Sequence, residues 1–266
     1  SENPFTVTAQ AAAKKIGLNK TKHTLTTGAA YTLKLLDKKG KTISASKVKW
    51  STSSKKIATV SSKGAVKGIK KGTATITATY KGEKYTCKVT VKNASLSNTK
   101  KTLVEGKSFT LKLKDAAGKN VSYKNIKFST SDKNIATVSK KGVVKAVGNG
   151  KATISATYLG KTYKCTVTAK GYIILSKSSM DIYYGDTDKR TVKVTLNDSS
   201  TIYYKIIEGG NLVNVSWSQK WKDSTTSLFI TPKYGNRTGI AKIKIYTETQ
   251  PKKYKVITVN FKTPTL

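Results

Sequence analysis

Few residues of this chain could carry out acid–base or nucleophilic chemistry. His23 is the only histidine among 266 residues, and it stands between Lys22 and Thr24 beside a predicted strand. A solvated side chain is expected there rather than a catalytic base. No spacing in the sequence pairs a nucleophile with its base, or one acid with one base. We therefore predict that the protein is not an enzyme, with no catalytic residues and no cofactor.

The sequence contains no cluster of His, Cys and carboxylate residues typical of a metal centre, so no metal site is predicted. The one alternative is a loop at Gly185, where Asp181, Asp186 and Asp188 could offer oxygen ligands to Ca²⁺. Aspartates beside a glycine are more often ordinary turn residues. The sequence leaves Ca²⁺ binding near Asp186 and Asp188 open.

Aromatic residues gather in the C-terminal third of the chain and could bind a ligand by stacking. Tyr183-Tyr184 and Tyr203-Tyr204 are adjacent pairs on predicted strands, so one member of each pair should face outward. Trp221 falls in a predicted turn, where an exposed ring could stack on a sugar or on a protein. The alternative is that these rings cover the ends of a domain or its junction with the preceding one. The predicted ligand-binding residues are Trp221, Tyr183, Tyr184, Tyr203 and Tyr204.

The domains that position these residues can be predicted from an internal repeat in the sequence. Trp50-Ser-Thr-Ser recurs as Phe128-Ser-Thr-Ser, 78 positions later, and Ile57-Ala-Thr-Val-Ser recurs from Ile135 at the same offset. A repeat of this length is longer than the solenoid units of about 20–50 residues, so each copy should be a small complete domain. The predicted organisation is an N-terminal segment 1–15, two repeats at 16–92 and 93–170, and a divergent domain at 171–266.

Apolar residues recur at every second position, which is typical of strands. Ala74, Ile76 and Ala78 alternate with threonines, as expected for antiparallel sheets with one wet face. Turn signals such as Asp37-Lys-Lys-Gly40 and Lys81-Gly82 divide each copy into about seven strands. The prediction is an all-β chain of three tandem immunoglobulin-like β-sandwich domains. Trp50, Phe128 and, in the third domain, Trp217 are the predicted core aromatics.

The two cysteines, Cys87 and Cys165, are also 78 positions apart, so they occupy one equivalent position in two domains. They cannot form a disulfide within a domain. Each cysteine stands two positions before an apolar residue, Val89 or Val167, and therefore on the same face of a predicted strand. This position predicts buried, unpaired thiols that pack as small hydrophobic groups. Bridging between chains or metal binding is the alternative.

The run from Trp50 to Gly68, followed by Gly72-Thr-Ala-Thr-Ile76, resembles the bacterial immunoglobulin-like group 2 domain, and so does the run from Phe128 to Ile154. This resemblance covers 16–170. It implies an extracytoplasmic module of adhesion or display, of the kind found in intimin- and invasin-like adhesins, without catalytic residues. The segment 171–266 matches weakly. There, Gly239-Ile-Ala-Lys-Ile243 repeats the Gly-x-Ala-x-Ile strand start and precedes a hairpin predicted to be two residues longer, near Glu248–Pro251.

The formal charge is +38, and only Arg190 and Arg237 among the basic residues are arginine. The first repeat has 18 lysines against two acidic residues, the second 16 against three, and the third domain 15 basic against seven acidic residues. Such a charge attracts polyanions, although lysines also solubilise the outward faces of strands. Sequence-specific nucleic-acid binding relies on arginine and is not expected.

The longest apolar stretches are a few residues, so no membrane insertion is predicted. The start at Ser1-Glu2-Asn3 predicts that a signal peptide is absent or removed. The predicted function is a monomeric, secreted or surface-bound bacterial protein for adhesion or display, with the third domain as the ligand-binding part. Its expected partner is a host-cell surface protein or glycan. The alternative is retention on anionic cell-wall polymers by the lysine-rich repeats.

Overall fold

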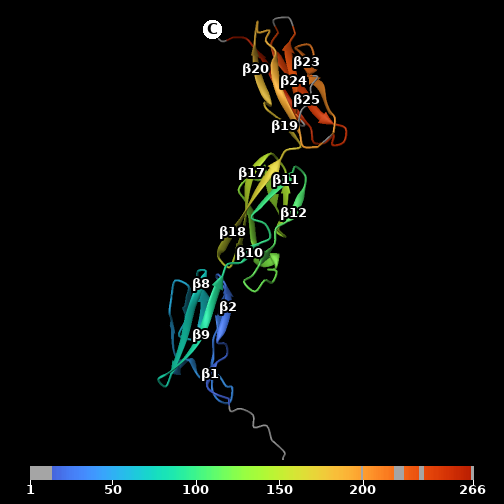
Figure 1. The fold of residues 1–266 in the computed structure, drawn as a ribbon. Helices are drawn as coiled ribbons and strands as arrows, with labels where there is room; N and C mark the ends of the chain where they lie inside the picture. The colour runs from blue at the N-terminus through green and yellow to red at the C-terminus, as the bar shows by residue number, and fades with distance from the viewer. Residues whose placement is uncertain (1–13, 199, 219–224, 234–236, 265–266) are drawn as a thin grey trace, which may run out of the picture.

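The structure is a computed structural model, and it describes residues 14–198, 200–218, 225–233 and 237–264. Three β-sandwich domains follow one another along a rod, with the first domain at one end and the third at the other (Figure 1). The helical elements of the described residues are two 3₁₀ turns, η1 (Ala45–Lys47) and η2 (Tyr123–Asn125). The prediction of an all-β chain with three tandem immunoglobulin-like sandwiches is confirmed.

The first domain packs a four-stranded sheet, ordered β2-β9-β8-β5, against a three-stranded sheet, β3-β7-β6, and adds the short pair β1-β4. Threonine and valine side chains, which are stiff at χ1, favour the extended backbone of these strands. The strands are β1 (Gly17–Leu18), β2 (Lys22–Thr26), β3 (Ala30–Thr32), β4 (Leu35–Leu36), β5 (Lys49–Thr52), β6 (Ala58–Val60), β7 (Ala65–Gly68), β8 (Gly72–Tyr80) and β9 (Glu83–Lys92).

The second domain repeats this arrangement with the sheets β11-β18-β17-β14 and β12-β16-β15 and the pair β10-β13. Its topology therefore follows the sequence repeat strand for strand. The strands are β10 (Ser95–Leu96), β11 (Lys100–Val104), β12 (Ser108–Thr110), β13 (Leu113–Lys114), β14 (Lys127–Thr130), β15 (Ala136–Val138), β16 (Val143–Ala146), β17 (Gly150–Tyr158) and β18 (Lys161–Lys170).

The third domain packs two four-stranded sheets, β20-β26-β25-β22 and β19-β21-β24-β23. The connection between β25 and β26 covers residues 248–254, against 81–82 and 159–160 in the first two domains, so it is longer, as predicted, but by more than the two residues expected from the sequence. The strands are β19 (Ile173–Leu175), β20 (Ser179–Tyr183), β21 (Arg190–Leu196), β22 (Ile202–Glu208), β23 (Val213–Trp217), β24 (Thr225–Pro232), β25 (Gly239–Thr247) and β26 (Lys255–Lys262).

Two details of the strand prediction are wrong. The first and last strands of the larger sheet run parallel in every domain, as β2-β9, β11-β18 and β20-β26, and not antiparallel. The first two domains also have nine short strands each instead of seven. The chain changes sheets as it enters each domain, which makes the first strand parallel to the last and adds one strand, and in the first two domains the next strand is also divided, into β3 and β4 or β12 and β13. Gly17–Leu18 pairs with β4 in one sheet, and Lys22–Thr26 then runs beside the last strand of the other.

Each domain has its own hydrophobic core between its sheets. In the first domain Ile76 and Cys87 are directly opposite each other on β8 and β9, and in the second Ile154 and Cys165 occupy the same places. Both cysteines are free and fully buried, which confirms the predicted unpaired thiols. Trp50, predicted as a core aromatic, packs against the core and stays partly exposed. Separate cores allow each sandwich to bury its own apolar surface.

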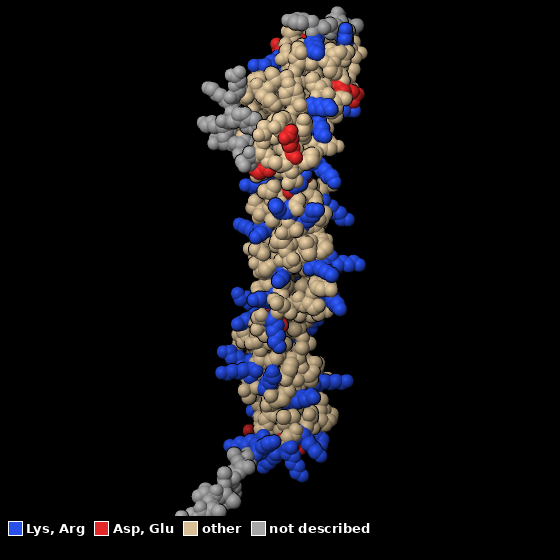
Figure 2. Space-filling model, turned by 90° about the vertical axis from the view of Figure 1, so that its right-hand side faces the viewer, with Lys and Arg blue, Asp and Glu red and all other residues tan. Residues whose placement is uncertain are grey.

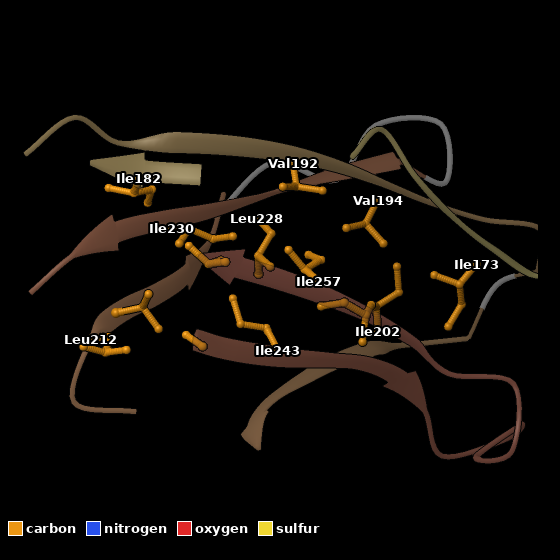
Figure 3. Close-up of a cluster of buried hydrophobic side chains, with 14 of the residues drawn as sticks. Ile173, Ile182, Val192, Val194, Ile202, Leu212, Leu228, Ile230, Ile243 and Ile257 are labelled. Carbon is orange, nitrogen blue, oxygen red and sulfur yellow. The ribbon is translucent and has the colours of Figure 1, made fainter. Parts of the chain in front are cut away.

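The third core is the most aliphatic, and it runs the length of the sandwich. Val192, Ile230, Ile243 and Ile257 are fully buried and converge from both sheets (Figure 3). Trp217, predicted to be the core tryptophan, packs against this cluster while remaining partly exposed. The same view shows Ile182 and Leu212 at one end of the core, below the turn that follows β20.

Two junctions hold the domains in line. At the first, the Ala116 N–H donates to Thr26 Oγ1 at 3.0 Å, and a Cβ at position 28 would overlap the Leu159 carbonyl. At the second, Glu105 Oε2 accepts from the Tyr172 N–H at 3.0 Å, and the Glu105 carbonyl accepts from Lys253 Nζ at 2.9 Å. In both cases a turn of the earlier domain meets a hairpin of the later one.

Candidate binding end of the third domain

The residues with potential acid–base or redox chemistry are engaged in packing. His23 lies within β2 and is half-buried, with its ring centroid 4.1 Å from that of Tyr31, so the predicted solvated position is wrong. Burial and then the nearby Lys20 lower the pKa of His23. Burial raises the pKa of both cysteine thiols. A histidine packed on a tyrosine and two enclosed thiols in separate domains form no reactive pair.

Tyr183 and Tyr184 lie at the end of the third domain that points away from the second domain (Figure 1). Tyr183 is the last residue of β20, and the Tyr184 N–H donates to the Lys262 carbonyl of the neighbouring strand at 2.9 Å. Both side chains are exposed, Tyr183 to 46% and Tyr184 to 47%. The prediction that only one member of the pair faces outward is therefore wrong here. Strand alternation ends at Tyr183, and Tyr184 belongs to the turn.

A shallow pocket opens beside this pair of rings. Besides the two tyrosines it is lined by Asp186, Leu212, Lys233 and Phe261. The rings and Phe261 offer apolar surface, while the lysine and the aspartate offer a charge of each sign. Such a mixture suits a protein surface or a sugar, because both present flat apolar patches next to hydrogen-bonding groups.

The aspartates around the pocket are paired with cations of the protein itself. Asp186 accepts a backbone hydrogen bond from Asp188 at 2.9 Å and forms an ion pair with Arg190, and these contacts lower its pKa. Asp181 accepts from Lys262 Nζ at 2.8 Å, and this contact lowers the pKa of Asp181. Within the described residues no group of three potential metal ligands comes together.

The second predicted pair lies on β22, apart from the first. Tyr203 faces outward, is 37% exposed and stacks on Tyr246 at 5.8 Å between ring centroids. Tyr204 faces inward, where its hydroxyl donates to the Val215 carbonyl at 2.7 Å and its ring meets Trp217 edge-on. One member faces outward in this pair, as predicted. Tyr204 is thus committed to packing, and the predicted Trp221 lies outside the described residues.

Sequence analysis missed part of the aromatic surface beside Tyr203. Lys244 Nζ lies 5.3 Å from the ring centroid of Tyr246 and 4.5 Å from that of Tyr254, which is 48% exposed. The sequence does indicate this surface, because side chains alternate along β25. Ile243 and Ile245 point inward, so Lys244 and Tyr246 must point outward. The third domain therefore carries aromatic surface at its end and on its side.

A protein-family model described as bacterial Ig-like domain (group 2) matches residues 12–89 and again 90–169. The chain is also 28% identical over 207 residues to Ice-binding protein 1 of Shewanella frigidimarina, strain NCIMB 400. That match covers 72% of this chain and 22% of the Shewanella protein, so the chain spans about a fifth of that relative.

Solved structures matched by this chain include domains 1–6 of the surface layer protein SbsC, with a TM-score of 0.29 and 18% identity. That alignment covers 95% of this chain and 40% of the SbsC chain. Another is the I9–I11 tandem of titin, with a TM-score of 0.36 and 14% identity, covering 94% of this chain and 97% of the titin fragment.

Proposed function

Since the chain belongs to the bacterial Ig-like domain (group 2) family, we propose that it is a non-enzymatic, extracellular surface protein of a bacterium. In this proposal the first two domains are spacers, and the third presents a binding end for adhesion or display. We propose for the units the boundaries expected from the sequence: a segment 1–15 and domains 16–92, 93–170 and 171–266. The matched relative is named for ice binding, and the proposal takes no activity from it.

The observation that carries this proposal is the difference between the ends of the domains. The turns after β2 and β11 begin with Thr26-Thr27 and Val104-Glu105, whereas the equivalent turn of the third domain begins with Tyr183-Tyr184, two exposed tyrosines beside a mixed pocket. Exposed aromatic rings cost little entropy when they bind and supply large contact areas, so they are common at the centres of interfaces. We propose a host-cell surface protein or glycan as the partner at this end.

The test compares binding to arrays of matrix proteins and glycans by three chains. These are the full chain, a chain ending at Lys170, and the full chain with Tyr183→Ser and Tyr184→Ser. Both altered chains should lose the binding shown by the full chain, while Tyr203→Ser keeps it. Equal binding by all of them would contradict a binding end in the third domain.

A second candidate is retention on an anionic wall polymer. Figure 2 shows lysine side chains projecting along the whole of the first two domains, with few acidic residues between them. A surface of this kind binds polyanions by releasing their counterions, so its affinity falls steeply as salt rises. Binding of the full chain to teichoic acid should weaken strongly between low and high salt. An affinity independent of salt would exclude this candidate.

A further inference from the structure

We propose that a groove in the second domain, beside Tyr123 and Phe128, binds an acidic sugar unit of a glycan. The second domain lies between the other two (Figure 1), and the residues that line the groove all belong to it. This site does not rest on the binding end of the third domain. It also differs from retention by diffuse charge, because it requires a surface of a particular shape.

The groove consists of two adjoining hollows on one side of the sandwich, of about 220 Å³ and about 560 Å³. Tyr123, Ile126 and Phe128 line both of them. Phe128 lies on β14, an edge strand of the larger sheet, and Val138 of the second hollow lies on β15, an edge strand of the smaller one. Ile126 is buried and Phe128 is half-buried, so the floor of the groove is apolar.

The sequence repeat shows which ring the first domain has at this place. Phe128 is the equivalent of Trp50, and both rings touch the glycine of the same turn. A Cβ on Gly64 would lie 2.8 Å from the Trp50 ring, and a Cβ on Gly142 would lie 2.8 Å from the Phe128 ring. The indole of Trp50 is larger than the phenyl ring, and its Nε1 is buried. The second domain therefore has room that the first domain fills.

Two other differences around this ring nearly cancel. Val121 replaces Ile43, which removes a methylene group, and Ile126 replaces Val48, which adds one. The exchange of an indole for a phenyl ring is therefore the net loss of apolar volume. Volume that the surrounding side chains do not refill remains as a cavity. Here that volume is open to solvent and can admit a ligand.

Tyr123 gives the groove a stacking surface that the first domain lacks. It stands in the place of Ala45, at the start of η2, and it is 41% exposed. The backbone below the ring is held, because the Tyr123 carbonyl accepts from the Ile126 N–H at 3.0 Å. An exposed aromatic ring beside an apolar floor suits the apolar face of a sugar ring.

The rim of the groove is cationic. Among the described residues that line the two hollows, none is acidic. A lysine ammonium attracts an anion without demanding a fixed geometry, so it suits the carboxylate of a sugar acid. An acidic sugar would use both the ring of Tyr123 and the charge of the rim, whereas a neutral sugar would use only the ring. The exposed lysines that line the hollows are Lys112, Lys124, Lys127, Lys140 and Lys141.

The test is isothermal titration calorimetry of the full chain with a hexasaccharide of galacturonic acid. The salt concentration should be high enough to suppress the general attraction of polyanions to a chain of charge +38. A neutral galactose hexasaccharide offers rings without charge, and a glutamate hexapeptide offers charge without sugar rings. The unaltered chain should bind the galacturonic acid hexasaccharide more tightly than either of them.

Two variants that leave the net charge unchanged locate the site. Tyr123→Ala removes the stacking ring, and Phe128→Trp fills the groove with the ring that the first domain already accommodates. Each should weaken binding at least about fivefold, as is typical of a residue at the centre of a contact. Tyr254→Ala removes a similarly exposed tyrosine beside Lys244 in the third domain and should bind like the unaltered chain.

The reciprocal change should build a second site. Trp50→Phe combined with Ala45→Tyr gives the first domain the two rings of the groove. The calorimetric stoichiometry should then double, whereas an unchanged stoichiometry would contradict the claim that these two rings make the site. Three lysines of the groove already have counterparts in the first domain, namely Lys34, Lys49 and Lys63.

Equal affinity of the unaltered chain, Tyr123→Ala and Phe128→Trp would overturn the proposal. So would an unaltered chain that binds the acidic hexasaccharide no better than the two comparison ligands. Circular dichroism of each variant establishes that it has folded, and the exposed position of Tyr123 keeps the test decisive if Phe128→Trp does not fold. Neither result bears on the third domain, because the chain ending at Lys170 keeps this groove and lacks that domain.

Discussion

The carboxylate of Glu105 accepts a hydrogen bond from the backbone N–H of Tyr172, 3.0 Å away, across the junction between the second and third domains. The same residue accepts from Lys253 Nζ through its carbonyl oxygen, so it ties two segments of the third domain to the end of the second. A contact of this kind limits the angle between neighbouring domains, and the straightness of the rod depends on it.

Glu105→Ala should loosen this junction without unfolding either sandwich. A hydrogen bond to a charged group is worth about 1.5–3 kcal/mol when enclosed, and less at a partly exposed junction such as this one. Small-angle X-ray scattering should show a shorter maximum dimension and a broader distribution of distances than in the unaltered chain. Glu83→Ala removes an equal charge from an exposed strand end and should leave the scattering curve unchanged.

Gly28→Ala should bend the first junction, and Gly185→Ala provides a matched control. Both glycines have positive φ, so both substitutions carry a similar backbone penalty, of roughly 1 kcal/mol. Only at position 28 does the new methyl group overlap the following domain, at Leu159. Melting temperatures should fall by similar amounts in the two variants, whereas only Gly28→Ala should shorten the particle in scattering. Equal scattering curves for the two variants would show that the contact at Gly28 does not determine the angle between the first two domains.

The stability of the first domain should decrease as the pH falls through the ordinary pKa of histidine. The pKa of His23 is lowered in the folded state, so the unfolded chain takes up its proton first, and protonation favours unfolding below the ordinary histidine pKa of about 6.5. The loss is complete once the pH is below the folded pKa. In His23→Gln the denaturation midpoint should stay constant over this window, because no other histidine titrates. If the denaturation midpoint of the variant still changes with pH over this window, groups other than His23 cause the change.

The thiols of Cys87 and Cys165 should be unreactive in the folded chain. Both are fully buried, and burial raises their pKa, so little thiolate is available to attack a reagent. A colorimetric disulfide reagent should label neither cysteine in buffer and both in denaturant. Cys87→Ser should destabilise the first domain by roughly 1–3 kcal/mol, because it buries a hydroxyl opposite Ile76. If the reagent labels either cysteine in buffer as fast as it labels a cysteine in a free peptide, the thiols are not buried.

Much of the fold follows from the sequence because alternation and repetition are local signals. Ala74, Ile76 and Ala78 occupy every second position, so they indicate which face of β8 is buried. Because the repeat offset is 78, the equivalent residues of β17 indicate the same buried face. The split first strand could not be predicted, because the change of sheet near Asn19 depends on partners that are distant in the chain. Similarly, nothing adjacent to His23 in sequence indicates that its ring packs on Tyr31.

The candidate site was only partly predictable. Tyr183 and Tyr184 were identified as a pair, but their joint exposure depends on where β20 ends, which is set by its pairing with β26. Tyr204 carries no signal that separates it from Tyr203 until the position of Trp217 is known. The pocket residue Lys233 directly follows β24 of one sheet and Phe261 lies on β26 of the other, and only the folded chain brings them beside Tyr184.

The central claim is that the third domain ends in a binding surface centred on Tyr183 and Tyr184. Its most direct test is an array of host matrix proteins and glycans, probed with the full chain, with Tyr183→Ser and Tyr184→Ser combined, and with Tyr203→Ser. The account predicts binding by the full chain, loss of at least about tenfold in affinity for the double variant, equivalent to roughly 1.4 kcal/mol, and no loss for Tyr203→Ser. Unchanged binding by the double variant would contradict it.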